Sequence, residues 1–180
     1  MQFERKSSPR LKGYDYSQPG AYFVTICTLK RMCIFGKIIE DRMVMNSLGD
    51  IICHTWKDIP NHYPYVTLDK FIIMPNHIHG IVMLLENRRD SRDRFVNLSL
   101  RKSHQRKRHG LSEIIRGFKT WSARRINQIQ NTTGTSVWQR SFYDHIIRDD
   151  DDLNRIRSYI VENPLIWDQD RNNPKFFSGE

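Results

Sequence analysis

Two histidines separated by a single residue, His77 and His79, form the part of the sequence with the clearest potential for chemistry. Side chains alternate across a β-strand, so these imidazoles would share one face about 6–7 Å apart and could hold one divalent cation. Ile78 would point into the opposite, apolar layer, and Gly80 would let a ligand or another backbone come close. Such a pair alone is more often two hydrogen-bonded or exposed histidines than a metal site, so its assignment depends on the surrounding elements.

A predicted helix over residues 151–163 carries a polar stripe that suits such a cation. Arg155, Tyr159 and Asn163 are spaced i, i+4 and i+8 and therefore line one face. The adjoining apolar stripe, which would dock the helix onto a sheet, consists of Leu153, Ile156 and Ile160. Proline follows Asn163 and disfavours a helical conformation there, so the helix should end with the Asn163 amide free to reach outward. If this helix packs beside the histidine strand, a phenol and an amide oxygen face the same cation.

These residue types predict strand cleavage at a phosphodiester. A tyrosine hydroxyl has a pKa near 10 and is a weak nucleophile at neutral pH. A cation such as Mg²⁺ or Mn²⁺, held by His77, His79 and the Asn163 amide oxygen, could polarise the phosphodiester and offset the charge that develops during attack. Attack by the Tyr159 phenolate would form a covalent phosphotyrosine. Tyr143 is the rival nucleophile, but it belongs to a predicted strand and has no helical partner comparable with Asn163.

An excess of basic residues points to a polyanionic partner. Lysine and arginine number 29 against 20 aspartates and glutamates, which gives a formal net charge of +9 and a sequence pI near 9.7. A positive field of this size attracts nucleic acid. The cations that we expect to contact DNA are Arg116, Lys119, Arg124, Arg148 and Arg155. The segment 86–110 is rich in arginine, lysine, serine and asparagine, and it predicts a basic loop that is either a solvated insertion or a phosphate-contacting arm.

The apolar periodicity predicts one α+β domain, with a mainly antiparallel sheet and helices packed against it, in the order β-α-β-β-α-β-α. Runs of β-branched and aromatic residues indicate strands over 21–28, 66–73, 77–85 and 138–148. Apolar residues at helical spacing indicate helices over 43–56, 111–129 and 151–163. Pro75 should separate the two middle strands. We expect a basic lead-in over residues 1–20, the functional domain over 21–167 and a C-terminal tail over 168–180.

The composition disfavours membrane and secreted proteins. No run of about 18 apolar residues occurs, so we expect no membrane-spanning helix. Residues 1–16 lack the apolar centre of a secretory signal. The three cysteines, Cys27, Cys33 and Cys53, show neither CxxC spacing nor a paired framework, which favours reduced thiols. We therefore expect a cytoplasmic protein.

Five segments together resemble a known family. The run FIIMPNHIHGIV at 71–82 is similar to the HUH segment of the single-tyrosine transposases of the IS200/IS605 type. Further segments resemble the branch of that family associated with repetitive extragenic palindromes (REPs), and they lie at 11–25, 114–119, 137–148 and 155–164. These segments span most of residues 10–167 in family order, which is far more specific than any one motif.

The resemblance implies an HUH endonuclease fold, which is ferredoxin-like, and assigns roles to residues of this chain. His77 and His79 match the metal-binding pair, Tyr159 matches the nucleophile, and Asn163 matches a polar residue one turn later that is commonly glutamine in the insertion-sequence type. The implied substrate is single-stranded DNA beside a hairpin, cut to leave a 5′-phosphotyrosine and a free 3′-hydroxyl. The implied enzyme is a monomer or a homodimer.

Two alternative functions stay open at the level of the sequence. One is a protein that binds hairpin DNA without cutting it. The other is a metal phosphoesterase that activates water, which would use the histidine pair but would not need Tyr159.

Overall fold

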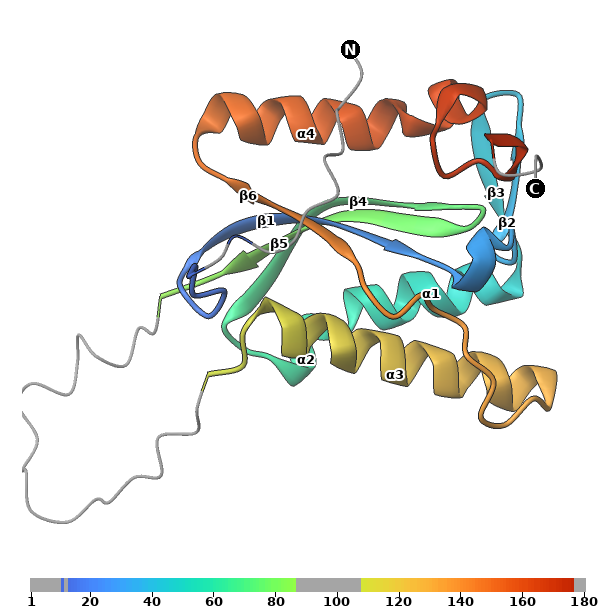
Figure 1. Ribbon diagram of the computed structural model, residues 1–180, viewed down its shortest axis with the longest axis horizontal. Coiled ribbons are helices and arrows are strands. Elements are labelled where there is room, and N and C mark those ends of the chain that lie inside the picture. Colours follow the sequence, from blue (N-terminus) through green and yellow to red (C-terminus); the bar gives the residue numbers. More distant parts are fainter. Residues whose placement is uncertain (1–10, 12, 87–107, 177–180) are drawn as a thin grey trace, which may run out of the picture.

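A four-stranded antiparallel sheet lies between two layers of helices (Figure 1). The computed structural model describes residues 11, 13–86 and 108–176. The strands lie in the order β4-β5-β1-β6, with bounds Gly20–Cys27 (β1), Val66–Met74 (β4), His77–Leu84 (β5) and Tyr143–Ile147 (β6). One face is covered by α1 (Ser47–Lys57), α2 (Ile59–His62) and α3 (Leu111–Gln130), and the other by α4 (Asp150–Glu162). The predicted α+β class and antiparallel sheet are confirmed.

Alternation along the strands gives each face of the sheet its own core. The larger core lies on the side of α1 and α3, and it includes Tyr22, Val24, Ile26, Trp56 and Phe118. The smaller core lies on the side of α4, and it consists of Phe23, Ile81, Ile156 and Ile160. Ile78 belongs to the larger core. The neighbouring His77 and His79 therefore face α4, as the period of the strand predicts.

A two-stranded hairpin that was not predicted from the sequence precedes α1. Its strands are β2 (Gly36–Ile39) and β3 (Arg42–Met45), joined by Glu40 and Asp41, both with positive φ, as a tight two-residue hairpin turn requires. The predicted start of the helix at residue 43 was wrong because Asn46 caps α1, its side chain accepting the N–H groups of Leu48 and Gly49. Met43 and Val44 fit the helical spacing and the strand equally well.

Strand β6 is shorter than the predicted range 138–148. Trp138 makes only an isolated bridge to Thr28, and its indole N–H donates to Ser122 Oγ at 2.9 Å, so this side chain packs into the core under α3. The two strands on either side of Pro75 form the expected break, with Met74 opposite His77 in the β4–β5 hairpin. Helix α3 agrees with its predicted range to within one residue, and it ends at Asn131, whose φ of 53° is left-handed.

The chain after α4 folds back beside the β2–β3 hairpin (Figure 1). It forms two short 3₁₀ helices, Asn163–Gln169 and Pro174–Phe176, and between them Asp170 and Asn172 are buried. Residues 1–10, 12, 87–107 and 177–180 lie outside the described part, and they include most of the predicted lead-in and basic loop. Within the described ranges, no helix has the length and apolar character needed to cross a membrane.

Candidate active site

The two histidines of β5 point their Nε2 atoms toward each other. His77 and His79 are fully buried, and their Nε2 atoms lie 3.0 Å apart. Each Nδ1 atom is held from behind: His77 Nδ1 lies 2.8 Å from Asn76 Oδ1, and His79 Nδ1 lies 2.8 Å from Thr25 Oγ1. Ligating histidines in metalloproteins are commonly oriented in this way, because a partner on one nitrogen directs the other at the metal.

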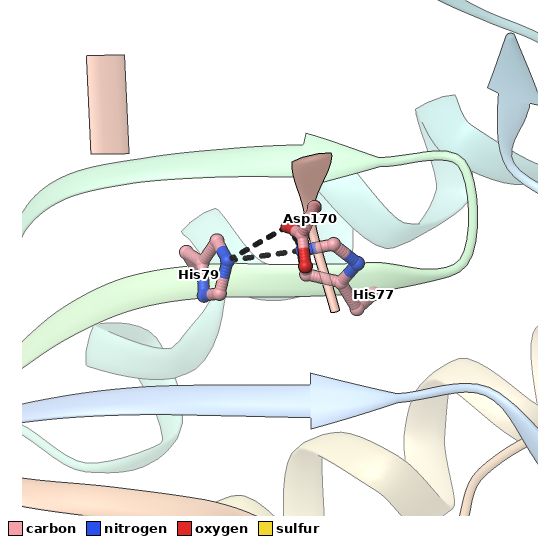
Figure 2. A group of neighbouring side chains, drawn as sticks. All are labelled: His77, His79 and Asp170. Atoms are coloured by element: carbon pink, nitrogen blue, oxygen red, sulfur yellow. Dashed lines mark hydrogen bonds and ion pairs between the residues drawn. The ribbon is translucent and has the colours of Figure 1, made fainter. Parts of the chain in front are cut away.

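Asp170 completes a group of three candidate ligands (Figure 2). Its Oδ2 atom lies 3.5 Å from His77 Nε2 and 4.0 Å from His79 Nε2. Burial on its own would raise the pKa of the Asp170 carboxyl, but the hydrogen bond with His79, the positive charge that His77 and His79 carry when protonated, and the N–H of Asn172 outweigh it and hold that pKa below its ordinary value. The group is therefore a carboxylate at neutral pH. Asp170 was not predicted from the sequence because no local spacing connects it with β5.

The donor set fits a divalent cation. All three candidate ligand atoms lie within 4.8 Å of one another. Ligands about 2.1 Å from a shared cation lie roughly 3.0–3.4 Å apart, which is close to the shorter separations in this group. Imidazole nitrogens and a carboxylate suit transition-metal ions such as Mn²⁺.

Asn163, the third ligand expected from the sequence, is also completely buried, directly after α4. Neither its amide nitrogen nor its amide oxygen has a hydrogen-bond partner among the described residues. A buried amide without partners is costly and rare, and it commonly marks a place where an ion or ligand binds. This observation is compatible with the predicted role of Asn163, which stays a prediction.

Tyr159 lies at the same site in the same chain. Its hydroxyl oxygen is 3.4 Å from His79 Nε2, and its ring meets the rings of His79 and Phe23 at centroid distances of 5.2 and 6.0 Å. The rival Tyr143 belongs to β6 and packs edge-on against Phe23 at 6.3 Å, in the core under α4. The Tyr159 hydroxyl therefore lies within hydrogen-bond range of a histidine of the candidate metal group.

Two polar contacts attach α4 to the outer strands of the sheet. Arg157 donates from Nε to Asp69 Oδ1 at 3.0 Å and from a terminal nitrogen to Asp69 Oδ2, which connects α4 with β4. His145 Nε2 lies 2.7 Å from Asp152 Oδ2, which connects α4 with β6. With the apolar stripe of α4 buried between these contacts, the position of Tyr159 over β5 is set from both sides.

The predicted DNA-contacting cations lie on two different faces of the molecule. Arg155 and Arg148 are exposed on or beside α4, and Arg155 forms an ion pair with Asp152. Arg116 and Arg124 are exposed on α3, which covers the opposite face of the sheet. The structure therefore brings Arg155 to the helix of Tyr159 and does not bring the α3 residues to the histidines.

Lys119, also on α3, is held by the main chain. Its Nζ donates to the carbonyl oxygens of Gln139 and Ser141 at 3.0 and 2.9 Å. Burial lowers the pKa of the Lys119 ammonium to about 8. This side chain therefore fixes the irregular segment before β6.

Two relatives from sequence comparison cover most of this chain. The chain is 39% identical over 175 residues to an uncharacterised protein of Haemophilus influenzae, covering 92% of each. It is 30% identical over 154 residues to another Haemophilus influenzae protein, whose name assigns it to the REP-associated tyrosine transposases, covering 84% of this chain and 73% of the relative.

Among solved structures, that of a REP-associated tyrosine transposase bound to a REP hairpin matches with a TM-score of 0.57 at 18% identity, covering 88% of this chain and 73% of that one, which shows a shared fold. No model of a protein family matches the chain. The similarity to the named relative, over 84% of this chain and 73% of the relative, shows that this chain belongs to the family of REP-associated tyrosine transposases.

Proposed function

We propose that this protein is a metal-dependent enzyme that cuts and rejoins single-stranded DNA beside palindromic hairpins through a 5′-phosphotyrosine. The observation that carries the proposal is the position of the Tyr159 hydroxyl, 3.4 Å from Nε2 of His79, at a buried group of two histidines and a carboxylate. This position supports a nucleophile acting at a cation site within one chain. Membership of the transposase family supports the same chemistry.

His77, His79 and Asp170 would hold a divalent cation such as Mg²⁺ or Mn²⁺, with the amide oxygen of Asn163 as a further ligand. When bound, the cation would polarise the scissile phosphodiester and offset the charge that develops on it. The ligands come from β5 and from the segment after α4, so the site forms only when the chain has folded back. The unpartnered, fully buried amide of Asn163 supports its inclusion.

Tyr159 is the proposed nucleophile. Its phenolic oxygen would form a bond to the phosphorus while the bond from phosphorus to the 3′-oxygen breaks, so the phenol loses its proton and the departing 3′-oxygen gains one. The products are a 5′-phosphotyrosine and a free 3′-hydroxyl. Attack by a 3′-hydroxyl on the phosphotyrosine reverses the step and joins DNA ends. Because the nucleophile and the candidate ligands belong to one chain, we propose that a monomer can cut.

Hairpin DNA with single-stranded flanks is the proposed partner. The net charge of +9 favours a polyanion, and the solved relative with the same fold is bound to a REP hairpin. Arg148 and Arg155 are exposed near the N-terminal half of α4 and would bind phosphates of the strand to be cut. Arg116, Lys119 and Arg124 lie on the opposite face, where the two exposed arginines would contact another part of the same DNA.

A covalent-adduct assay tests the proposal. Purified protein is incubated with end-labelled hairpin DNA that carries single-stranded flanks, with and without Mn²⁺ or Mg²⁺, and resolved under denaturing conditions. We expect a metal-dependent adduct that survives denaturation. Hairpin binding without cleavage would favour a DNA-binding protein that does not cut, and cleavage without an adduct would favour a phosphoesterase that activates water.

A further inference from the structure

Asn76 lies in the turn between β4 and β5 and is completely buried, directly before His77. Its amide nitrogen donates to the carbonyl oxygens of Arg31 at 2.8 Å and Asn172 at 2.7 Å, and its amide oxygen lies 2.8 Å from His77 Nδ1. Both donor hydrogens and the acceptor are therefore used. A buried amide this fully bonded has one orientation, because the reversed one would set its oxygen against two carbonyl oxygens.

This orientation determines which nitrogen of His77 carries the proton. An amide oxygen can only accept, so His77 Nδ1 must donate to it and carry the hydrogen. The Nε2 atom of the neutral ring is then a lone pair, aimed at His79 Nε2 at 3.0 Å and Asp170 Oδ2 at 3.5 Å. A histidine binds a metal through such a lone pair.

The partner of His79 differs in kind from the partner of His77. Thr25 Oγ1, 2.8 Å from His79 Nδ1, is a hydroxyl and can either donate or accept. It therefore fits both neutral forms of the His79 ring. The His77 ring is thus held in one form. The His79 ring can carry its hydrogen on Nε2, donating to the lone pair of His77 Nε2 in the absence of a cation, or on Nδ1 when Nε2 binds one.

The amide of Asn76 also holds the turn that carries Asp170, the candidate carboxylate ligand. The carbonyl oxygen of Asn172 accepts from Asn76, and the N–H of the same residue donates to Asp170 Oδ1 at 2.7 Å. With Oδ1 held in this way, Oδ2 faces the histidines. Arg31 supports the turn by donating to the carbonyl of Arg171 at 2.6 Å.

We infer that Asn76 is the positioning residue of the metal site: it fixes the proton of His77 on Nδ1 and holds the turn that carries Asp170. The inference rests on the proposed function insofar as the three ligands bind a cation. The side chain of Asn76 would thus position two candidate ligands, His77 and Asp170, that are distant in the sequence. Replacing partners of this kind typically weakens metal binding about 10- to 100-fold.

The first test reads the His77 ring directly. In cation-free protein labelled with ¹⁵N-histidine, NMR should show His77 protonated on Nδ1 at neutral pH in the wild type. Asn76→Ala should lose this preference, whereas Asn76→Asp, which keeps an acceptor beside the ring, should retain it. A wild-type His77 protonated on Nε2 alone, or an Asn76→Ala protein with an unchanged ring, overturns the inference.

The second test measures Mn²⁺ affinity from the electron paramagnetic resonance signal of free Mn²⁺. Both variants should bind about 10- to 100-fold more weakly than the wild type, Asn76→Asp because it has lost the donors to the Asp170 turn. Asn127→Ala is the matched control, since it removes a buried amide on α3, away from the histidines, that donates to the carbonyl oxygen of Thr135, and it should retain wild-type affinity.

The outcomes separate this inference from the proposed function. Wild-type affinity in both Asn76 variants would overturn the positioning role even if the wild type cuts DNA. A wild type that binds no Mn²⁺ would overturn the metal site, while the NMR result would still decide whether Asn76 fixes His77. If Asn76→Ala does not fold, the wild-type spectrum and Asn76→Asp decide.

Discussion

The guanidinium of Arg157 bonds both carboxylate oxygens of Asp69, and this pair fixes α4, the helix that carries Tyr159, to the edge strand β4. The hydrogen bond from Arg157 lowers the pKa of Asp69, against the smaller opposing effect of burial. A carboxyl whose pKa is lower in the folded than in the unfolded state stabilises the fold above its unfolded pKa of about 3.9 and loses that contribution as the pH falls through its folded pKa.

Asp69→Asn should therefore lower the free energy of unfolding at pH 7, and the difference from the wild type should narrow as the pH is lowered toward 3. It should also slow cleavage several-fold by loosening α4, far less than loss of Tyr159 would. Urea unfolding at several pH values measures the first effect. Asp41→Asn, an exposed turn substitution, is the control. A difference in stability that stays constant across this pH range would contradict the role of the pair.

Tyr159→Phe removes one oxygen and should leave the packing against Phe23 and His79 nearly intact. With no other nucleophile in its position, we expect the cleavage rate to fall at least about a thousandfold, or roughly 4 kcal/mol in the barrier. Thermal unfolding should change little. Tyr143→Phe is the matched control and should retain most activity. Peptide mapping of the trapped adduct decides the assignment, and a nucleotide on the peptide of Tyr143 would reverse it.

Asp170→Asn keeps the shape of the side chain and removes the charge that faces the histidines. We expect Mn²⁺ affinity to fall about tenfold or more, measured by calorimetry, with hairpin binding nearly unchanged because phosphate contacts dominate DNA affinity. Asp168→Asn, two residues earlier and exposed, is the control.

The double substitution His77→Ala and His79→Ala should abolish cleavage altogether, and cleavage at the wild-type rate would refute the metal assignment.

Asn163→Ala separates the two candidate oxygen ligands. Because the amide of Asn163 has no hydrogen-bond partner among the described residues, its removal should not lower stability through a lost bond. If it binds the cation, Mn²⁺ affinity falls while thermal stability in the absence of metal holds or rises. Unchanged Mn²⁺ affinity would leave Asp170 as the oxygen ligand and remove Asn163 from the set.

Binding of flanked hairpin DNA should weaken steeply with salt. The slope of log affinity against log salt changes by about 0.7 to 0.9 for each phosphate contact. Arg148→Gln should therefore make the slope shallower by up to about one unit. Lys37→Gln, an equal change of charge on the β2–β3 hairpin, should not. Equal slopes for the two variants, or equal affinity for blunt duplex and flanked hairpin, would count against the proposed path of the DNA.

The spacing of residues in the sequence was enough to predict several elements and which of the candidate site residues share a strand or helix face. His77 and His79 share a strand face, and Tyr159 and Asn163 lie one turn apart at the end of a helix, because backbone geometry sets the periods of strands and helices. The limits of β4, β5 and α3 follow for the same reason. The β2–β3 hairpin was missed because its few apolar residues fit either period, and only the Asn46 cap decides where α1 begins.

The tertiary structure alone decided which distant groups meet. Asp170 reaches the histidines because the chain after α4 folds back to the β4–β5 turn, where Asn76 donates to the carbonyl oxygen of Asn172. No spacing within the sequence predicts that approach. Packing likewise put α3 on the face opposite α4, so Arg116 and Arg124 of α3 lie away from Tyr159 of α4 and the histidines that it faces. Such convergence depends on how whole elements bury their apolar faces, which is a property of the assembled layers and not of any one segment.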